Sequence, residues 1–219
     1  MITVHHLEKS RSHRIIWLLE ALAVPYQLRT YQRDSRTLLA PSALKKVHAL
    51  GKAPVLTDNE LTLTESGAII EYLLDSYGQD AELRPSTEPA LTQYRYWLHY
   101  AEGSLMPLLV MSLVMSRIGE SPTPWLLRPL ARMIGNTVKA QYLQPQLDSH
   151  LAMIEQHLSQ QPWFAGAFSA ADMQMAYPLE AAAGRLEMVA YPQIQGFIRR
   201  CQALPAYQAA LAKGGPVSL

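Results

Sequence analysis

Several features that would point to particular protein classes are scarce in this sequence. Its 219 residues contain one cysteine, Cys201, so no disulfide can form within the chain, and a reducing cytosol is the expected location. Lys and Arg total 19 against 18 Asp and Glu, a balance that argues against broad binding to nucleic acid or to an anionic membrane. The N-terminus does not read as a signal peptide, and the longest apolar run, Leu105–Val114, is too short to span a bilayer. We therefore predict a cytoplasmic protein without a membrane segment.

The apolar residues, 49% of the chain, are spaced differently in its two parts. Residues 2–7 and 26–31 are β-prone and enclose a helical pattern that Pro25 ends, and such a strand–helix–strand unit pairs its strands in parallel. The elements that follow are a weaker helix over 37–48, a hairpin with strands at 55–57 and 61–63, and a helix over 65–77. This order predicts one mixed sheet covered by helices.

The pattern changes at residues 79–88, a polar segment flanked by glycine and proline that reads as a linker. Beyond it only helical spacing remains, over 89–117, 125–158, 170–187, 192–203 and 205–213. One helix start is clearly marked, because Ser169 and Asp172 have the spacing of a capping box and Phe168 can pack onto Met173. We expect two domains, at 1–78 and 89–219.

Four motifs in this order carry a resemblance that covers nearly the whole chain: Ser10-Arg11-Ser12 after the first strand, Lys52-Ala53-Pro54-Val55, Glu65-Ser66, and the capped start Phe168–Asp172. Together they resemble the cytosolic glutathione transferases, and most closely the bacterial and fungal members with a serine in the first loop. The resemblance implies an α/β thioredoxin-like N-terminal domain that binds glutathione as co-substrate. It also implies an all-α C-terminal domain that contributes a pocket for a small hydrophobic electrophile, and a homodimer.

The resemblance also assigns residues to glutathione. The bond before Pro54 is expected to be cis, and the main chain of Ala53, left free where the strand starts late, is expected to bind the cysteine part of the tripeptide. Lys52 would hold the glycine carboxylate, and His48 is a weaker candidate for the same role because the family often has other residues there.

The other end of glutathione is assigned to the start of the helix over 65–77. Free N–H groups and the positive end of a helix suit a carboxylate. By resemblance, Ser66 and its N–H bind the γ-glutamyl carboxylate, while Glu65 pairs with the γ-glutamyl ammonium. Ordinary capping by Thr64 is the alternative that local sequence alone favours.

The expected reactive centre is the loop between the first strand and the first helix. It contains no cysteine, which argues against cysteine-based disulfide chemistry and leaves Ser10, Arg11 and Ser12. Lowering a thiol pKa from about 8.5 by two units corresponds to roughly 2.7 kcal/mol, and one charge-assisted hydrogen bond supplies about 1.5–3 kcal/mol. One well-placed hydroxyl, helped by the helix dipole and the nearby Arg11, therefore suffices. Ser10 occupies the place of the activating serine in related proteins, and Ser12 is expected to cap the helix.

Other candidates favour structural roles. His5 and His6 alternate along a strand and face opposite ways, so no metal site is expected, and Cys201 fits the core. Four methionines could line the electrophile pocket or simply belong to the core: Met106, Met111, Met115 and Met133. A non-catalytic adaptor of the same fold remains an alternative function, as does a specialised glutathione-dependent dehalogenase, isomerase or peroxidase.

Overall fold

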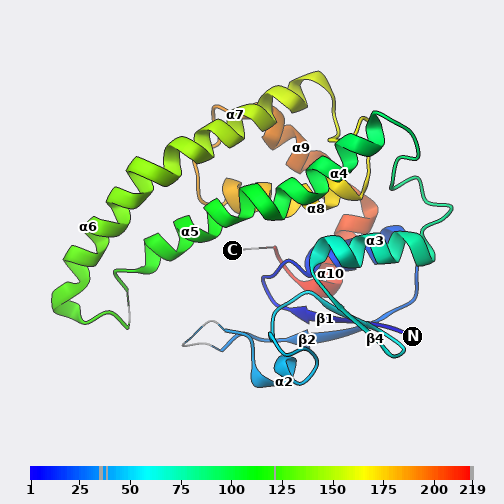
Figure 1. The fold of residues 1–219 in the computed structure, drawn as a ribbon, viewed down its shortest axis with the longest axis horizontal. Coiled ribbons are helices and arrows are strands. Elements are labelled where there is room, and N and C mark those ends of the chain that lie inside the picture. Colours follow the sequence, from blue (N-terminus) through cyan, green and yellow to red (C-terminus); the bar gives the residue numbers. More distant parts are fainter. Residues whose placement is uncertain (35–36, 38, 121, 218–219) are drawn as a thin grey trace.

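Residues 2–77 form a mixed sheet flanked by helices, as predicted. The computed structural model describes residues 1–34, 37, 39–120 and 122–217. Its strands are β1 (Ile2–Leu7), β2 (Gln27–Tyr31), β3 (Val55–Asp58) and β4 (Leu61–Thr64), in the sheet order β2-β1-β3-β4 (Figure 1). β1 is parallel to β2 and antiparallel to β3, and β3 and β4 form the expected antiparallel hairpin. The central position of β1 places its C-terminal end in the interior.

The helices of this half differ in how well the sequence predicts them. α1 (His13–Ala21) and α3 (Ser66–Tyr77) lie close to the predicted limits. The helix expected over 37–48 is wrong in extent: the structure has only α2 (Ser42–Lys45), and residue 38 lies outside the described part. Pro41 directly precedes α2 in an extended conformation, and a proline also disfavours helical geometry in the residue before it. The helix therefore cannot start earlier.

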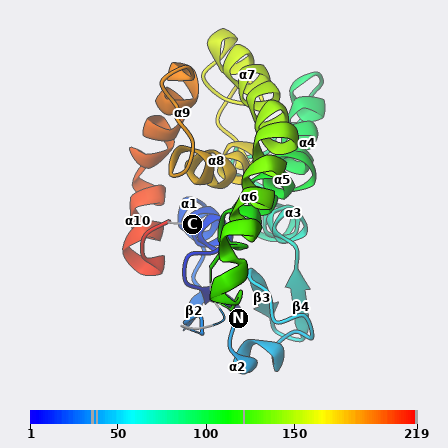
Figure 2. The same cartoon turned by 90° about the vertical axis from the view of Figure 1, so that its left-hand side faces the viewer.

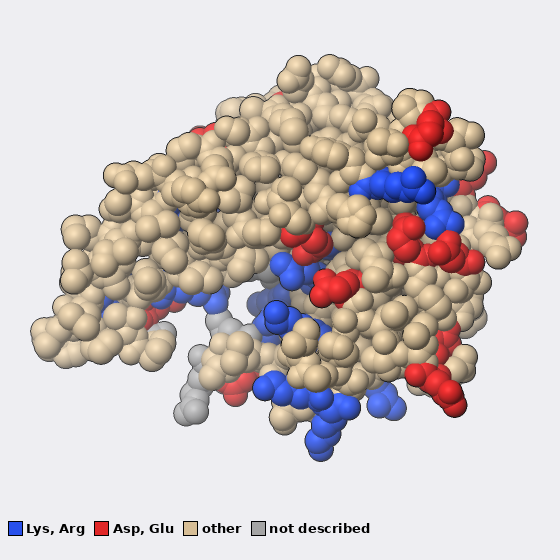
Figure 3. Space-filling model, viewed as in Figure 1, with Lys and Arg blue, Asp and Glu red and all other residues tan. Residues whose placement is uncertain are grey.

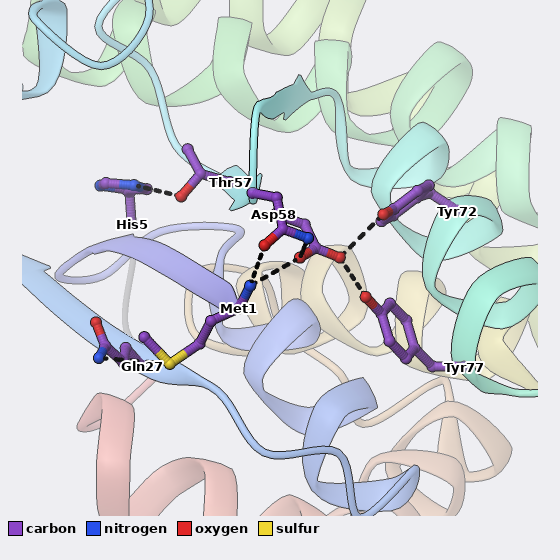
Figure 4. A network of polar contacts seen from close by, with 8 residues as sticks. Met1, His5, Gln27, Thr57, Asp58, Tyr72 and Tyr77 are labelled. Carbon is purple, nitrogen blue, oxygen red and sulfur yellow. Dashed lines mark hydrogen bonds and ion pairs between the residues drawn. The ribbon is translucent and has the colours of Figure 1, made fainter.

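Asp58, at the end of β3, contacts residues of α3 and the residue that precedes β1 (Figure 4). Its buried carboxylate accepts hydrogen bonds from the hydroxyls of Tyr72, at 3.0 Å, and Tyr77, both on α3. It also pairs with the amino group of Met1, at 3.3 Å. The bond from Tyr77 is the largest of the effects that lower the pKa of Asp58. Asp58 therefore joins the start of β1 to α3 through the charged form of its carboxyl group.

The rest of the chain is helical, as expected. After residues 78–89, which contain no helix or strand, come α4 (Ala90–Tyr100), α5 (Met106–Arg117), α6 (Arg128–Val138), α7 (Gln144–Gln160), α8 (Ala170–Ala183), α9 (Pro192–Gln202) and α10 (Pro205–Gly214). α5 and α6 form an arm that reaches beyond the sheet (Figure 1), and α6 lies in front when the molecule is turned (Figure 2).

Two wide turns interrupt the long helices. The π turn Ala101–Leu105 joins α4 to α5, and a second, Lys139–Leu143, joins α6 to α7. Each lies just before a proline, Pro107 and Pro145, at the start of the next helix. Proline lacks an N–H and its ring excludes the carbonyl four residues back, so a wider turn relieves the clash. The predicted helices 89–117 and 125–158 are therefore continuous but irregular.

The last helix returns to the N-terminal half and packs against α1. The Lys213 ammonium lies 2.5 Å from Glu20, and the rings of Tyr207 and Trp17 meet edge to face with 5.0 Å between their centres. The carbonyl of Gly214 accepts a hydrogen bond of 2.8 Å from Nε2 of His6. α10 therefore reaches the C-terminal part of β1, beside the loop that carries Ser10.

The run Ala90–Arg117 is long and apolar enough to cross a membrane by length and composition alone, a property that helices of globular cores share. Only 33% of its most apolar window is buried within this chain. Its exposed apolar side chains include Tyr96, Val110, Met111 and Val114.

We expect Asp172→Ala to destabilise the protein without weakening glutathione binding. The Asp172 carboxylate accepts bonds of 2.8 Å from the N–H of Phe164 and the N–H of Ser169, and completes the predicted capping box. Each buried donor left without an acceptor costs about 1–3 kcal/mol, so the loss should be on the order of 3 kcal/mol. Urea denaturation measures it, with the exposed Asp148→Ala as control. An unchanged midpoint with lost turnover would contradict this assignment.

Candidate functional site

A cavity between the two halves of the molecule brings together most residues that the sequence singles out. It lies where the sheet meets the start of α3 and the π turn after α4. Its lining consists of Arg11, His48, Leu50, Lys52, Ala53, Pro54, Thr64, Glu65, Ser66 and Glu102. Ser10 and Ser12 are not part of this lining and are buried beside it.

The wall formed by Ala53 offers a free main chain. The bond between Ala53 and Pro54 is cis, as predicted. β3 begins only at Val55, and no main-chain hydrogen bond among the described residues engages Ala53. Its N–H and C=O are therefore available to an extended ligand.

The start of α3 forms a second wall, with two different residues side by side. Glu65 is exposed and adopts φ 69° and ψ 118°, in the left-handed half of backbone space, where residues other than glycine are uncommon. Ser66, 4% exposed, is the first residue of the helix. The first N–H groups of a helix have no partner within it, so this end presents donors to the cavity. Thr64 belongs to β4 and does not cap α3.

Basic groups also line the cavity. Lys52 is exposed at the cavity, and His48 is half-buried with an Nδ1 that has no hydrogen-bond partner among the described residues. The tight turn that follows His48 includes Gly51, with φ +58°, whose N–H donates to the His48 carbonyl at 2.8 Å. The structure therefore places His48 in the cavity, although the sequence alone gave it a weak case.

Glu102 is a cavity residue that sequence reasoning missed. It lies in the π turn Ala101–Leu105 and forms ion pairs with Arg11, at 3.1 Å, and Arg14, at 2.7 Å. The sequence signal that could have revealed Glu102 is its position as a lone acidic residue in an apolar helix, five residues before a proline. Pro107 inside the predicted helix implies a local irregularity just upstream, which is where Glu102 faces the cavity.

Arg14, behind the cavity wall, is 1% exposed. Its Nη1 donates to Glu102, at 2.7 Å, and to the amide oxygen of Gln174, at 2.6 Å, while the guanidinium lies 4.9 Å from the ring centre of Tyr177. Arginine keeps its charge in proteins, so these partners must balance it in the interior. α1, the π turn and α8 are thus joined by one buried ionic network.

The two serines form a hydrogen-bonded chain that ends on β1. The Ser10 and Ser12 hydroxyls are 2.6 Å apart, and the Ser12 hydroxyl lies 2.8 Å from Nδ1 of His6. Ser12 occupies the N-cap position of α1, but its side chain makes no capping hydrogen bond, so its expected role as a cap is wrong. The His6 acceptor draws the hydroxyl away from the helix N–H groups.

The remaining candidates separate into core and surface. Cys201 is fully buried, and burial raises the pKa of its thiol well above the usual value. Met106 is also core, whereas Met111 and Met133 are exposed and Met115 is partly buried. His5 bonds to Tyr31 and Thr57, on the opposite face of β1 from the serines. Among the described residues, no three His, Cys, Asp or Glu side chains are placed to hold a metal ion.

Comparison with known proteins identifies the family. The family models for the glutathione S-transferase N-terminal and C-terminal domains match residues 1–75 and 125–212. Glutathione S-transferase 3 of Schizosaccharomyces pombe is 39% identical over 97% of this chain and 88% of its own. The chain is a member of the glutathione S-transferase family.

Solved structures agree on this fold over almost the full length. A glutathione S-transferase from Actinobacillus pleuropneumoniae, 33% identical, superimposes with a TM-score of 0.81 over 98% of this chain and 93% of its own. A sphingomonad glutathione S-transferase solved in complex with glutathione is 21% identical, with a TM-score of 0.74 over 97% and 98% of the two chains, and shows the shared fold. The thioredoxin-like N-terminal domain and helical C-terminal domain are those of a glutathione transferase.

In this glutathione transferase, we expect Glu102→Gln to lower stability by about 1.5–3 kcal/mol, the range for a hydrogen bond to a charged group. Glutamine keeps an acceptor for Arg14 but removes the charge that balances its buried guanidinium. Urea denaturation checks this, with Glu120→Gln as a control on an exposed glutamate of the arm. Equal midpoints for both variants would show that Glu102 does not compensate Arg14.

Proposed function

We propose that this glutathione transferase binds glutathione along the cavity between Lys52 and Ser66 and adds its thiolate to an electrophilic carbon of a small hydrophobic compound. The observation that carries the proposal is that a free main chain at Ala53, a helix N-terminus at Ser66 and Arg11 of the serine loop line one cavity, with Ser10 and Ser12 buried on either side of Arg11 in the chain. The limits 1–78 for the glutathione-binding domain, 79–88 for the linker and 89–219 for the helical domain belong to the same proposal.

The two ends of glutathione differ in charge, and so do the two ends of the cavity. Lys52, with His48 beside it, suits the glycine carboxylate, while the first turn of α3 at Ser66 suits the γ-glutamyl carboxylate. Glu65, exposed next to Ser66, suits the γ-glutamyl ammonium. The N–H and C=O of Ala53 would pair with the cysteinyl residue in the manner of an added strand.

This placement directs the sulfur toward the loop between β1 and α1. Ser10 would touch the sulfur and stabilise its anion, with help from the Arg11 guanidinium and the positive end of α1. The rate of conjugation would increase because the thiol is ionised and because the thiolate and the electrophile are held in position. The protein itself would form no covalent bond with either substrate. An adaptor that binds partners through the fold alone has no need for this set of residues.

The electrophile would enter from the hollow under the arm of α5 and α6. Figure 3 shows this hollow between the arm and the sheet domain, with Lys and Arg side chains at its inner end. Exposed apolar side chains on the arm favour a hydrophobic compound, among them Trp125, Leu130 and Met133. Cationic groups nearby would favour the release of an anionic leaving group.

The proposal includes a homodimer in the cytoplasm. The apolar side chains left exposed on α4 and α5, such as Tyr96 and Val114, suit the sheet domain of a second copy, whose own Leu61 and Tyr77 are also exposed. Such a contact would cover the apolar face of Ala90–Arg117.

We expect Ser10→Ala to raise the pKa of bound glutathione by about one unit and to lower conjugation about tenfold, since one lost charge-assisted bond of about 1.5 kcal/mol corresponds to that factor. Ultraviolet absorbance of the bound thiolate against pH measures the change. Lys52→Ala is the matched control: it should weaken glutathione binding and leave the thiol pKa unchanged. A bound-thiol pKa in Ser10→Ala equal to the wild-type value would remove Ser10 from the reaction.

We expect sedimentation to give twice the chain mass of 24.5 kDa at micromolar concentration. Met111→Glu, which puts a charge into the exposed face of α5, should shift the protein toward monomers. Val189→Glu, on an exposed residue between α8 and α9, is the control and should leave the dimer intact. A wild-type monomer would overturn the dimer proposal.

A further inference from the structure

The hydrogen-bonded chain beneath the cavity has a fixed direction. The carbonyl of Gly214 can only accept, so the bond of 2.8 Å from His6 places a proton on Nε2. In neutral imidazole Nδ1 is then an acceptor, and the Ser12 hydroxyl, at 2.8 Å, must donate to it. Oγ of Ser12 in turn accepts from the Ser10 hydroxyl, at 2.6 Å.

In this state every hydroxyl proton points away from the cavity. The Ser10 hydroxyl proton is directed at Ser12, and the Ser12 N–H also points at Oγ of Ser10, at 3.3 Å. Ser10 can therefore accept a hydrogen bond from a thiol, but it cannot donate one to a thiolate without giving up its bond to Ser12. The resting chain is prepared to take a proton from the cavity.

We propose that His6 is the terminal acceptor of the glutathione thiol proton, reached through Ser10 and Ser12. The S–H proton passes to Oγ of Ser10, the Ser10 proton to Oγ of Ser12, and the Ser12 proton to Nδ1 of His6. The products are a thiolate and an imidazolium, and no proton leaves the protein. The bonds between Ser10 and Ser12 and between Ser12 and His6 are kept with their directions reversed, so Ser10 now donates to the thiolate, while Nε2 of His6 still donates to the Gly214 carbonyl. His6 acts as a positioning residue, since it does not touch the sulfur.

Two helix ends favour this separation of charge. Gly214 is the last residue of α10, whose C-terminal carbonyls carry partial negative charge and favour an imidazolium. The serines lie at the opposite kind of end, the N-terminus of α1, which favours a thiolate. The transfer therefore moves positive charge toward the negative end of one helix and leaves negative charge at the positive end of another.

The groups around His6 agree with a neutral resting state. Burial lowers the pKa of His6, while the Gly214 carbonyl and the charge of Glu8 oppose that effect. On α1, His13 does not compete for the proton, because burial lowers its pKa to about 4. The cation of α10, Lys213, is held by Glu20, and the residue of β2 paired with His6 is the uncharged Thr30.

The inference rests on the proposed function and adds the route of the proton. After the thiolate attacks and the leaving group departs as an anion, the proton on His6 returns through Ser12 and Ser10 and is released to that anion or to solvent. Overall, the thiol and the electrophile give a thioether, the leaving group as an anion and one proton, which that anion or the solvent takes up. The chain is then neutral and points away from the cavity again.

Nitrogen-15 spectra of the histidine rings test this in the intact protein. At neutral pH, His6 should change from the Nε2–H form to the imidazolium when glutathione is added. S-methylglutathione, which fills the same cavity but has no S–H proton, should leave His6 neutral. His5, on the opposite face of β1, is the internal control and should not change with either ligand.

Two variants interrupt the chain at different points. In Ser12→Ala, His6 should stay neutral with glutathione and the thiol pKa should rise by about one unit, as expected for a lost charge-assisted bond. His6→Asn keeps an acceptor for Ser12 but cannot be protonated, and should raise the thiol pKa similarly. Both should bind S-methylglutathione with wild-type affinity, which shows that the variants fold and keep the cavity.

The outcomes separate the two proposals. If wild-type protein binds neither glutathione nor S-methylglutathione, the proposed function fails. If glutathione binds and its thiolate absorbance appears while His6 remains neutral, the function stands and the proton route is overturned. A bound-thiol pKa equal to the wild-type value in both Ser12→Ala and His6→Asn would overturn the proton route as well.

Discussion

The burial of α1 on all sides is the constraint on which the other parts of the structure depend. Every residue from His13 to Leu19 is buried, since the sheet, α3, α8 and α10 all pack against this helix. Each large apolar side chain buried there contributes about 1.5–3 kcal/mol, so five of them outweigh the several kcal/mol that the buried charge of Arg14 costs. That charge nevertheless requires fixed partners, and the chain supplies them from other helices.

The partners of Arg14 connect the helical domain to the cavity. Glu102 reaches both Arg14 and Arg11 because the π turn before Pro107 widens the helix at that point. A regular helix would rotate the residues after Ala101 by a different amount and move Glu102 relative to α1. One proline in a long apolar helix is thus linked, through an ion pair, to the position of an arginine in the cavity. The two domains are joined at the site by charge, in addition to apolar packing.

The sequence predicted those features that depend on residues close together in the chain. The β3–β4 hairpin and the capping box of Ser169 and Asp172 are confirmed. The cis bond before Pro54, which the family resemblance implied, is confirmed as well. The helix predicted over 37–48 failed for a local reason, Pro41, but two other failures depend on partners outside the element itself. Ser12 would cap α1 if only α1 were present, but His6 takes its hydroxyl, and the π turn that aims Glu102 matters only because Arg14 is buried elsewhere. Local patterns cannot show which distant partner a polar side chain will meet.

In the proposed proton route, the position of α10 would give the C-terminal domain a part in the chemistry of the thiol, in addition to its proposed part in the electrophile pocket. A helix end is a source of partial charge that needs no ionisable side chain, and it is already oriented before any ligand arrives. Here the negative end of α10 lies against His6, and the positive end of α1 lies at the serines. The hydroxyls of Ser12 and Ser10 form the hydrogen-bonded chain that starts at His6. A serine alone can only donate to an anion that has already formed. In the proposed route, the same serine, placed between these two helix ends and a histidine, would also take part in forming the anion. A loop without cysteine would in this way generate a nucleophile from a bound thiol.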